Sequence, residues 1–453
     1  MIEAGTEDVI RIECVFRAGN IKEHLPLLAS SANMMLTEGS ERYTSEELNA
    51  LLDFYGIFLN LQAERDTAGL TAYLLSRYFD KSLELIAEVL FCPVFPAKEL
   101  EKLMKKRLNW FRINREKVQN IASDRFFQSV FGINHPYGRQ ISEPDFDGMT
   151  PALLRDFHSR LYRPEEMAVI VSGKIPGSAA ASLEKHFGCL RSEKIQSIET
   201  ESIIEGSPVR KEHIKKKGAV QTAIRIGAAT INKRHPDYPG LKFLNVILGG
   251  YFGSRLMKNI REEKGYTYGI HSIVSSFDKS GFRMISTEVG RENAGKAVDE
   301  IKKEINMLLS IPVPADEIEV VSNYMAGEIV RLFDGPMAIA ESFKSAWEFG
   351  LDLSYFSAIM HTIRTITPEE LLKLANTYYT YDALDRVTQV SYERKPEDDV
   401  TRATYLSKLA DAQRKYDNAV RLLNNLQGSP NEIDLSIADA SLSLAQARLA
   451  LAE

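Results

Sequence analysis

The part of the chain that decides the fold is a mostly apolar stretch, Leu25-Pro26-Leu27-Leu28-Ala29-Ser30-Ser31-Ala32-Asn33-Met34-Met35-Leu36-Thr37-Glu38-Gly39-Ser40. Apolar residues on both sides of its centre indicate a helix, and Gly39-Ser40 marks the exit. Ser30, Asn33 and Met34 place a hydroxyl, an amide and a thioether within this helix. Its chemistry therefore depends on what these three side chains can do.

The residues that follow alternate between helix and strand signals. Thr44 and Glu47 form a capping box that begins a helix, and Gly56 ends that helix. Residues 57–63 alternate in the manner of a strand with one buried face, and residues 67–75 read as its partner. Long amphipathic helices are expected over roughly 80–92 and 97–130.

The second half of the chain repeats the pattern of the first. The segment that begins Thr150-Pro151 and the segment that begins Thr367-Pro368 each lead through a helix to a strand, and they align without a gap at an offset of 217 residues. In both, Thr caps the helix and Pro takes its first position. A second echo relates Asn33–Ser40 to Gly250–Ser254 at an offset near 214. The two matches indicate a duplicated α+β unit.

The last part of the chain has a different character. Apolar residues recur at alternating steps of four and three over residues 405–426 and again over 435–452, on either side of a turn at 427–431. This spacing predicts a two-helix antiparallel coiled-coil hairpin. The hairpin resembles those of membrane-fusion adaptor subunits. An appended helical arm and a tail foreign to the rest of the protein are the alternatives.

These patterns divide the chain into four parts. Residues 1–195 form a first α+β domain, 196–212 a polar linker, 213–392 a second α+β domain, and 393–453 the helical hairpin. Each domain is expected to be a mostly antiparallel sheet covered by helices, so the fold class is α+β with two homologous repeats.

The bulk composition excludes several classes of function. The chain has 453 residues, 44% hydrophobic and 26% charged, with a net charge of −6 and no basic stripe, which argues against nucleic-acid binding. No apolar run is long enough to span a bilayer. Three cysteines, Cys14, Cys92 and Cys189, are expected as buried free thiols in a reducing compartment. A signal peptide is not evident, so we expect a cytoplasmic protein, although the chain starts within the predicted first sheet.

Residues 2–391 resemble the insulinase/pitrilysin-type zinc metallopeptidases, whose inverted zinc motif is H-x-x-E-H. The resemblance rests on residues 25–40 and on a second stretch, Gly249-Gly250-Tyr251-Phe252-Gly253-Ser254-Arg255-Leu256-Met257-Lys258-Asn259-Ile260-Arg261-Glu262-Glu263-Lys264-Gly265-Tyr266-Thr267-Tyr268-Gly269. In that family the second stretch is a glycine-rich loop, a helix and a strand. Gly249-Gly250 lacks the context of a phosphate-binding loop and is expected to let the backbone pass close to a neighbour.

The zinc motif of the family is lost here. Ser30 replaces the first His, Asn33 the Glu and Met34 the second His. A hydroxyl, an amide and a thioether cannot bind Zn²⁺ and activate water as two imidazoles and a carboxylate do. The family's third ligand, a Glu, falls near Trp110, and residues 107–111 hold no carboxylate. The chain is therefore expected to bind no metal or other cofactor itself.

The resemblance carries a second pair of residues that this chain retains. Arg261 and Tyr268 match an Arg and a Tyr that face the zinc site across the family's chamber. They imply a guanidinium for substrate carbonyls or a terminal carboxylate, and a hydroxyl for the oxyanion. The alternative is structural: Arg261 paired with Glu262 or Glu263, and Tyr268 packed in the sheet.

Bacterial heterodimers of this family divide the active site between a zinc subunit and a subunit that supplies the Arg and Tyr. The resemblance therefore implies a non-catalytic subunit of a zinc endopeptidase that acts on short or unfolded peptides. Its partner would be a homologous catalytic subunit with an intact H-x-x-E-H motif, which would hold the zinc. The alternatives are a proteolytically inert peptide-binding or assembly subunit and, less favoured, a presequence receptor.

Overall fold

The computed structural model describes residues 1–188, 211–216, 219–379 and 386–391. Residues 1–214 and 221–391 group into one compact unit. The predicted coiled-coil hairpin at 393–453 and nearly all of the predicted linker at 196–212 lie outside the described residues. Within the described part, no helix is both long and apolar enough to cross a membrane.

The first sheet has five strands in the order β1 (Ile2–Glu3), β5 (Ala168–Gly173), β2 (Val9–Phe16), β4 (Ala68–Leu75) and β3 (Phe58–Ala63). The short β1 pairs with β5 in parallel, and the other neighbours are antiparallel. β2 is buried along almost its whole length because helices cover the sheet. The partially exposed β3 forms one edge, and the predicted strands at 57–63 and 67–75 are confirmed.

The second sheet also has five strands, in the order β6 (Lys211–Lys215), β10 (Arg386–Ser391), β7 (Gln221–Thr230), β9 (Gly281–Gly290) and β8 (Thr267–Ser276). β10 and β9 lie antiparallel to β7, and β8 lies antiparallel to β9. When strands are counted within each half, both sheets run 1-5-2-4-3. This shared order is the pattern that a duplicated unit predicts.

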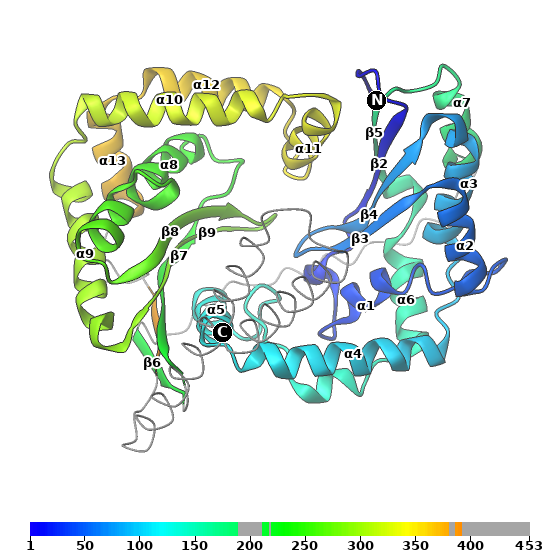
Figure 1. Cartoon of the computed structure of the whole chain (residues 1–453), viewed down its shortest axis with the longest axis horizontal. Helices are drawn as coiled ribbons and strands as arrows, with labels where there is room; N and C mark the ends of the chain where they lie inside the picture. The colour runs from blue at the N-terminus through cyan, green and yellow to red at the C-terminus, as the bar shows by residue number, and fades with distance from the viewer. Residues whose placement is uncertain (189–210, 217–218, 380–385, 392–453) are drawn as a thin grey trace, which may run out of the picture. The chain divides into compact units, whose positions relative to one another are not determined.

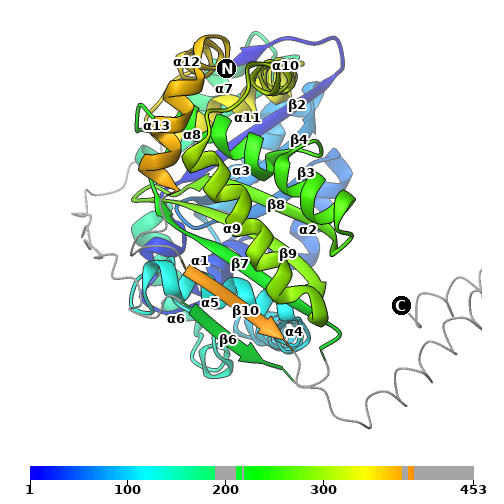
Figure 2. The ribbon, with the colours of Figure 1, turned by 90° about the vertical axis from the view of Figure 1, so that its left-hand side faces the viewer.

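Helices cover the sheets of both halves (Figure 1). The first half contains α1 (Leu28–Met34), α2 (Ser45–Tyr55), α3 (Phe79–Phe91), α4 (Ala97–Arg115), α5 (Val118–Phe131), α6 (Pro151–Leu161) and α7 (Ala179–Leu183). The second half contains α8 (Tyr238–Asn245), α9 (Ala294–Ser310), α10 (Ala315–Arg331), α11 (Pro336–Trp347), α12 (Ser354–Thr365) and α13 (Pro368–Tyr378). Figure 2 shows α9 lying across the second sheet, where it closes an apolar core.

The helix caps form as the sequence predicts. The Thr44 hydroxyl accepts a hydrogen bond from the Glu47 N–H, the Glu47 carboxylate accepts one from the Thr44 N–H, and Gly56 ends α2 with a positive φ of 65°. Thr150 caps α6 and Thr367 caps α13, each followed by Pro. These caps fix the start of each helix and hence the entry into the strand that follows.

The predicted long helix over 97–130 is wrong in one respect. The chain leaves helical geometry at Lys117, whose ψ is 125°, and this break separates α4 from α5. After the break, α5 packs against β7 and β10 of the second sheet. Because its phenylalanines bury their rings against that sheet, packing outweighs the local preference for a continuous helix.

The two halves are joined by an aromatic cluster, which we call the aromatic joint. Its buried residues are Phe126, Val130, Phe131, Tyr137 and Phe282, with Phe127 and Phe277 packed against them. The Phe127 and Phe282 rings meet edge to face with their centroids 5.0 Å apart. At its rim, the Tyr137 hydroxyl donates to the Asp66 carboxylate, whose other oxygen accepts from the Asp278 N–H at 2.8 Å. The β3–β4 turn and the β8–β9 turn are thereby tied together.

We expect Tyr137→Phe to lower the free energy of unfolding by about 1–3 kcal/mol, because it removes the hydroxyl of a buried tyrosine that donates to the partly buried Asp66 carboxylate. Urea denaturation followed by circular dichroism measures the change. Tyr43→Phe is the control, since among the described residues its hydroxyl bonds only the exposed Arg42 side chain, and its loss should have little effect. Equal stability of the two variants would contradict the claim that the Tyr137–Asp66 hydrogen bond stabilises the fold.

Candidate functional site

The helix that corresponds to the zinc helix of the family is α1, and a buried carboxylate organises its first turn. Leu27, which precedes the helix, has a left-handed φ of 70°. The Glu23 carboxylate accepts a hydrogen bond from the Ala29 N–H at 2.9 Å and pairs with Arg139 at 2.9 Å. Burial raises the pKa of Glu23, while the Ala29 N–H and Arg139 act in the opposite direction. The Glu23 carboxylate thus stabilises the first turn of α1.

Asn33 has become a structural anchor of the helix. Its side chain is 1% exposed, and its Nδ2 donates to the Gly69 carbonyl at 2.9 Å and to the Tyr162 hydroxyl at 3.1 Å. A carboxylate at this position could not donate to the Gly69 carbonyl. The amide therefore suits a tie to the sheet and does not suit the activation of water. Its Oδ1 atom has no partner among the described residues.

Arg107 of α4 forms hydrogen bonds with the two serines that lie near Asn33 on α1. Its Nη2 donates to Ser30 Oγ at 2.7 Å and its Nη1 donates to Ser31 Oγ at 2.6 Å. Both serine hydroxyls donate in turn to the Leu27 carbonyl, at 3.2 and 2.6 Å. Burial lowers the pKa of Arg107 to about 10, so the guanidinium stays charged at neutral pH. We call α1 with Arg107 the cradle.

The cradle does not suit a zinc ion. Ser30 and Asn33 are engaged in hydrogen bonds, Met34 is 45% exposed, and the Arg107 cation would repel a second cation. Trp110, near the expected third ligand, is 68% exposed. Over the described ranges, no three His, Cys, Asp or Glu side chains come together in a way that could hold a metal ion. We therefore derive no chemistry through a metal in this chain.

Arg261 and Tyr268 lie on the second half, at the segment Met257–Glu263 and on β8. The Arg261 guanidinium lies over the Phe252 ring, 4.7 Å from its centroid, and forms no ion pair with Glu262, Glu263 or any other described residue. Tyr268 is 92% exposed on the edge strand of the sheet. Neither side chain has a hydrogen-bond or ion-pair partner among the described residues, and Arg261 is partly exposed.

The glycine before this segment has the expected use. A Cβ at Gly249 would lie 2.7 Å from Cβ of Ser272 and 2.8 Å from its backbone nitrogen. Only glycine allows the chain to pass that close to β8. The prediction that Gly249-Gly250 serves a close backbone approach is confirmed at Gly249.

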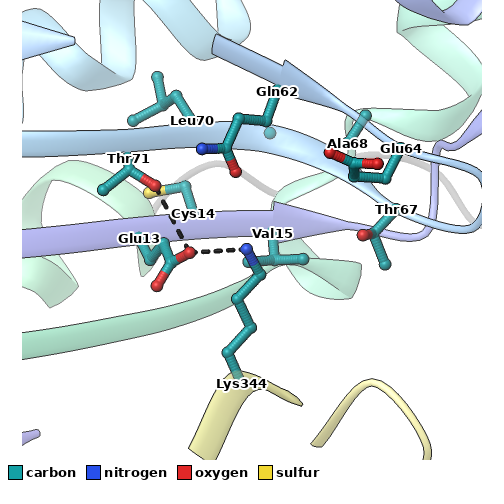
Figure 3. Close-up of a pocket in the computed structure, with 11 residues that line it drawn as sticks. Glu13, Cys14, Val15, Gln62, Glu64, Thr67, Ala68, Leu70, Thr71 and Lys344 are labelled. Atoms are coloured by element: carbon teal, nitrogen blue, oxygen red, sulfur yellow. Dashed lines mark hydrogen bonds and ion pairs between the residues drawn. The ribbon is translucent and has the colours of Figure 1, made fainter. Parts of the chain in front are cut away.

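A small cavity lies between the first sheet and α11 (Figure 3). Its volume is about 20 Å³, which is room for about one water. The Lys344 Nζ donates to Glu13 Oε1 at 2.7 Å, and Thr71 donates to the same oxygen at 3.4 Å. Arg11 extends the network to the Glu13 carboxylate and to the Met337 carbonyl. This ion-pair network joins the halves and leaves no space for a substrate.

Sequence reasoning missed Arg107 and the Glu13–Lys344 pair. Arg107 lies within residues 107–111, where the resemblance implies a carboxylate ligand. A guanidinium in this range is itself a sign that the site does not hold a metal ion. Glu13 carries a weak signal, because a charged residue within an apolar strand needs a partner when it is buried. Lys344 lies 331 residues away, so no local pattern could have identified that partner.

Comparisons with known proteins identify relatives of the chain. Residues 22–145 match the family described as "Insulinase (Peptidase family M16)", and residues 148–325 match "Peptidase M16 inactive domain". The chain is 23% identical over 299 residues to an uncharacterized zinc protease, YmxG, of Bacillus subtilis, covering 65% of this chain and 72% of that protein. It is 21% identical over 352 residues to a non-peptidase homolog, also called YmxG, of Helicobacter pylori, covering 76% and 80%.

The fold also matches a solved structure. A peptidase M16 inactive domain from Pseudomonas fluorescens superimposes with a TM-score of 0.79 at 23% identity, covering 87% of this chain and 96% of that one. The two family matches together span about two thirds of the sequence. The chain is an inactive homologue that belongs to the insulinase, or M16, family of peptidases.

Proposed function

We propose that this protein is the non-catalytic subunit of a heterodimeric zinc metalloendopeptidase. It supplies Arg261 and Tyr268 to the active site of a homologous catalytic subunit that carries H-x-x-E-H, and the pair acts on short or unfolded peptides. The observation that carries the proposal is a contrast within one chain. Ser30 and Asn33 are already hydrogen-bonded and Met34 is a thioether, whereas Arg261 is partly exposed and Tyr268 is exposed.

The two side chains suit complementary tasks. An arginine offers five donors in a planar fork that fits carbonyl or carboxylate oxygens, and stacking on Phe252 restricts its motion. A tyrosine hydroxyl can donate to the oxyanion that forms when water attacks a peptide carbonyl. Both tasks need a metal-bound water from another chain, so we place zinc in the partner subunit.

Further parts of the proposal concern the whole chain. We take the two halves as homologous repeats, each contributing one wall of the peptide chamber, and the tail at 393–453 as a coiled-coil hairpin used in assembly. We place the protein in the cytoplasm, without nucleic-acid partners, on its composition.

A second function is favoured by one specific observation. The repeated apolar spacing of the tail is typical of assembly, so the protein could instead act as a proteolytically inert peptide-binding or structural subunit. Co-purification distinguishes the two. The first function requires a homologue with H-x-x-E-H to co-purify and to gain peptidase activity on mixing.

The purified full chain should contain less than about 0.1 zinc per chain after dialysis, because the cradle offers Arg107 and no acidic or imidazole ligands. Elemental analysis by mass spectrometry measures this content. One zinc per chain, retained against a weak chelator, would overturn the reading of α1 as a metal-free helix.

In the complex with the catalytic subunit, Arg261→Ala or Tyr268→Phe should each lower kcat for peptide hydrolysis by about 10²–10³, the usual cost of losing one oxyanion donor. The measurement is turnover of a quenched fluorescent peptide. Tyr266→Phe is the matched control in the same segment and should leave turnover unchanged. Full activity of both Arg261 and Tyr268 variants would remove them from the active site.

A further inference from the structure

Arg107 is a partly buried cation that lacks a carboxylate partner. Its two terminal nitrogens bond the neutral hydroxyls of Ser30 and Ser31, and no described carboxylate lies within ion-pair distance of it. Of the five guanidinium N–H donors, these bonds occupy two. The remaining donors have no partner in the part of the chain that the structure describes.

The charge around Arg107 is not balanced locally. Glu23 is the carboxylate whose field reaches it, but Glu23 already pairs with Arg139 and caps the Ala29 N–H. The three side chains together carry one net positive charge. A buried charge is costly unless an opposite charge or several hydrogen bonds compensate it, so an anionic ligand would gain energy here.

The position is held rigidly enough to select a ligand. Each serine that accepts from the guanidinium also donates to the Leu27 carbonyl, so both hydroxyls are oriented by α1 itself. This arrangement fixes the plane of the guanidinium fork, and a fixed fork matches the two oxygens of a carboxylate.

We propose that Arg107 is a carboxylate-binding residue, which holds a carboxylate of a bound peptide in the cradle where the active members of the family hold zinc. The inference rests on the proposed function only in taking the ligand to be a peptide. The carboxylate can be the peptide's C-terminus or an acidic side chain. Arg107 thus positions the peptide, while Arg261 and Tyr268 contact the bond to be cut.

The test uses the full chain and three fluorescent octapeptides of one neutral sequence: the free acid, the C-terminal amide, and the amide with one internal Asp. Fluorescence anisotropy measures each Kd. We expect the free acid, the Asp-bearing amide or both to bind at least about tenfold more tightly than the neutral amide. Which one does so identifies the source of the carboxylate.

Arg107→Gln should abolish this preference and leave the affinity for the neutral amide within about twofold. Arg107→Lys keeps the charge but loses the fork, so it should retain only part of the preference. The matched control is Arg112→Gln, because Arg112 lies on the same helix and pairs with the exposed Glu143. Circular dichroism confirms that each variant is folded.

The outcomes separate the two proposals. Equal binding of all three peptides by the native chain, or a preference that survives in Arg107→Gln, would overturn the assignment of Arg107 and leave the proposed function standing. A preference lost equally in Arg112→Gln would also overturn it, because the effect would then be nonspecific charge. If none of the three octapeptides binds the full chain, the assignment of Arg107 is overturned, while the proposed function is still decided by turnover in the complex.

Discussion

The hydrogen bonds of Asp66 are the constraint on which the arrangement of the site depends. One oxygen of this carboxylate accepts from the Tyr137 hydroxyl and the other from the Asp278 N–H, so the turns of two edge hairpins from different halves share one partly buried group. Burial raises the pKa of Asp66, while the hydrogen bonds from Tyr137 and from the Asp278 N–H act in the opposite direction. Because α1 packs on β3 and β4 while Tyr268 lies on β8, the same joint holds both candidate sites in one compact unit.

At the positions that the resemblance aligns with the zinc motif, the side chains make their own set of contacts with the surrounding residues. Asn33 can donate to the Gly69 carbonyl, which a glutamate could not do, and Ser30 is small enough to admit the guanidinium of Arg107. Restoring one histidine would therefore break a hydrogen bond without completing a metal site. The contacts of Ser30, Asn33 and Arg107 are compatible with one another, and α1 is therefore well packed.

The sequence predicted those features that depend on neighbouring residues. Thr44, Thr150 and Thr367 cap their helices, and the strand alternation at 57–63 and the close approach at Gly249 are confirmed. It failed at Lys117, where no glycine or proline marks the break and the cause is burial of α5 against a distant sheet. It also missed Arg107, because the contact with α1 spans 76 residues and a guanidinium was not the group expected there.

The cradle contains a cation, the Arg107 guanidinium, although its side chains do not suit a metal ion. In an active member, the positive charge comes from an ion that needs deprotonated ligands around it, whereas here it comes from a side chain that needs only hydroxyls. The consequence is chemical as well as structural. A guanidinium cannot lower the pKa of a bound water as zinc does, but it can still attract and orient an anionic group. The cradle has thus lost the capacity for hydrolysis while it keeps the electrostatic character that favours the carboxylate of a peptide.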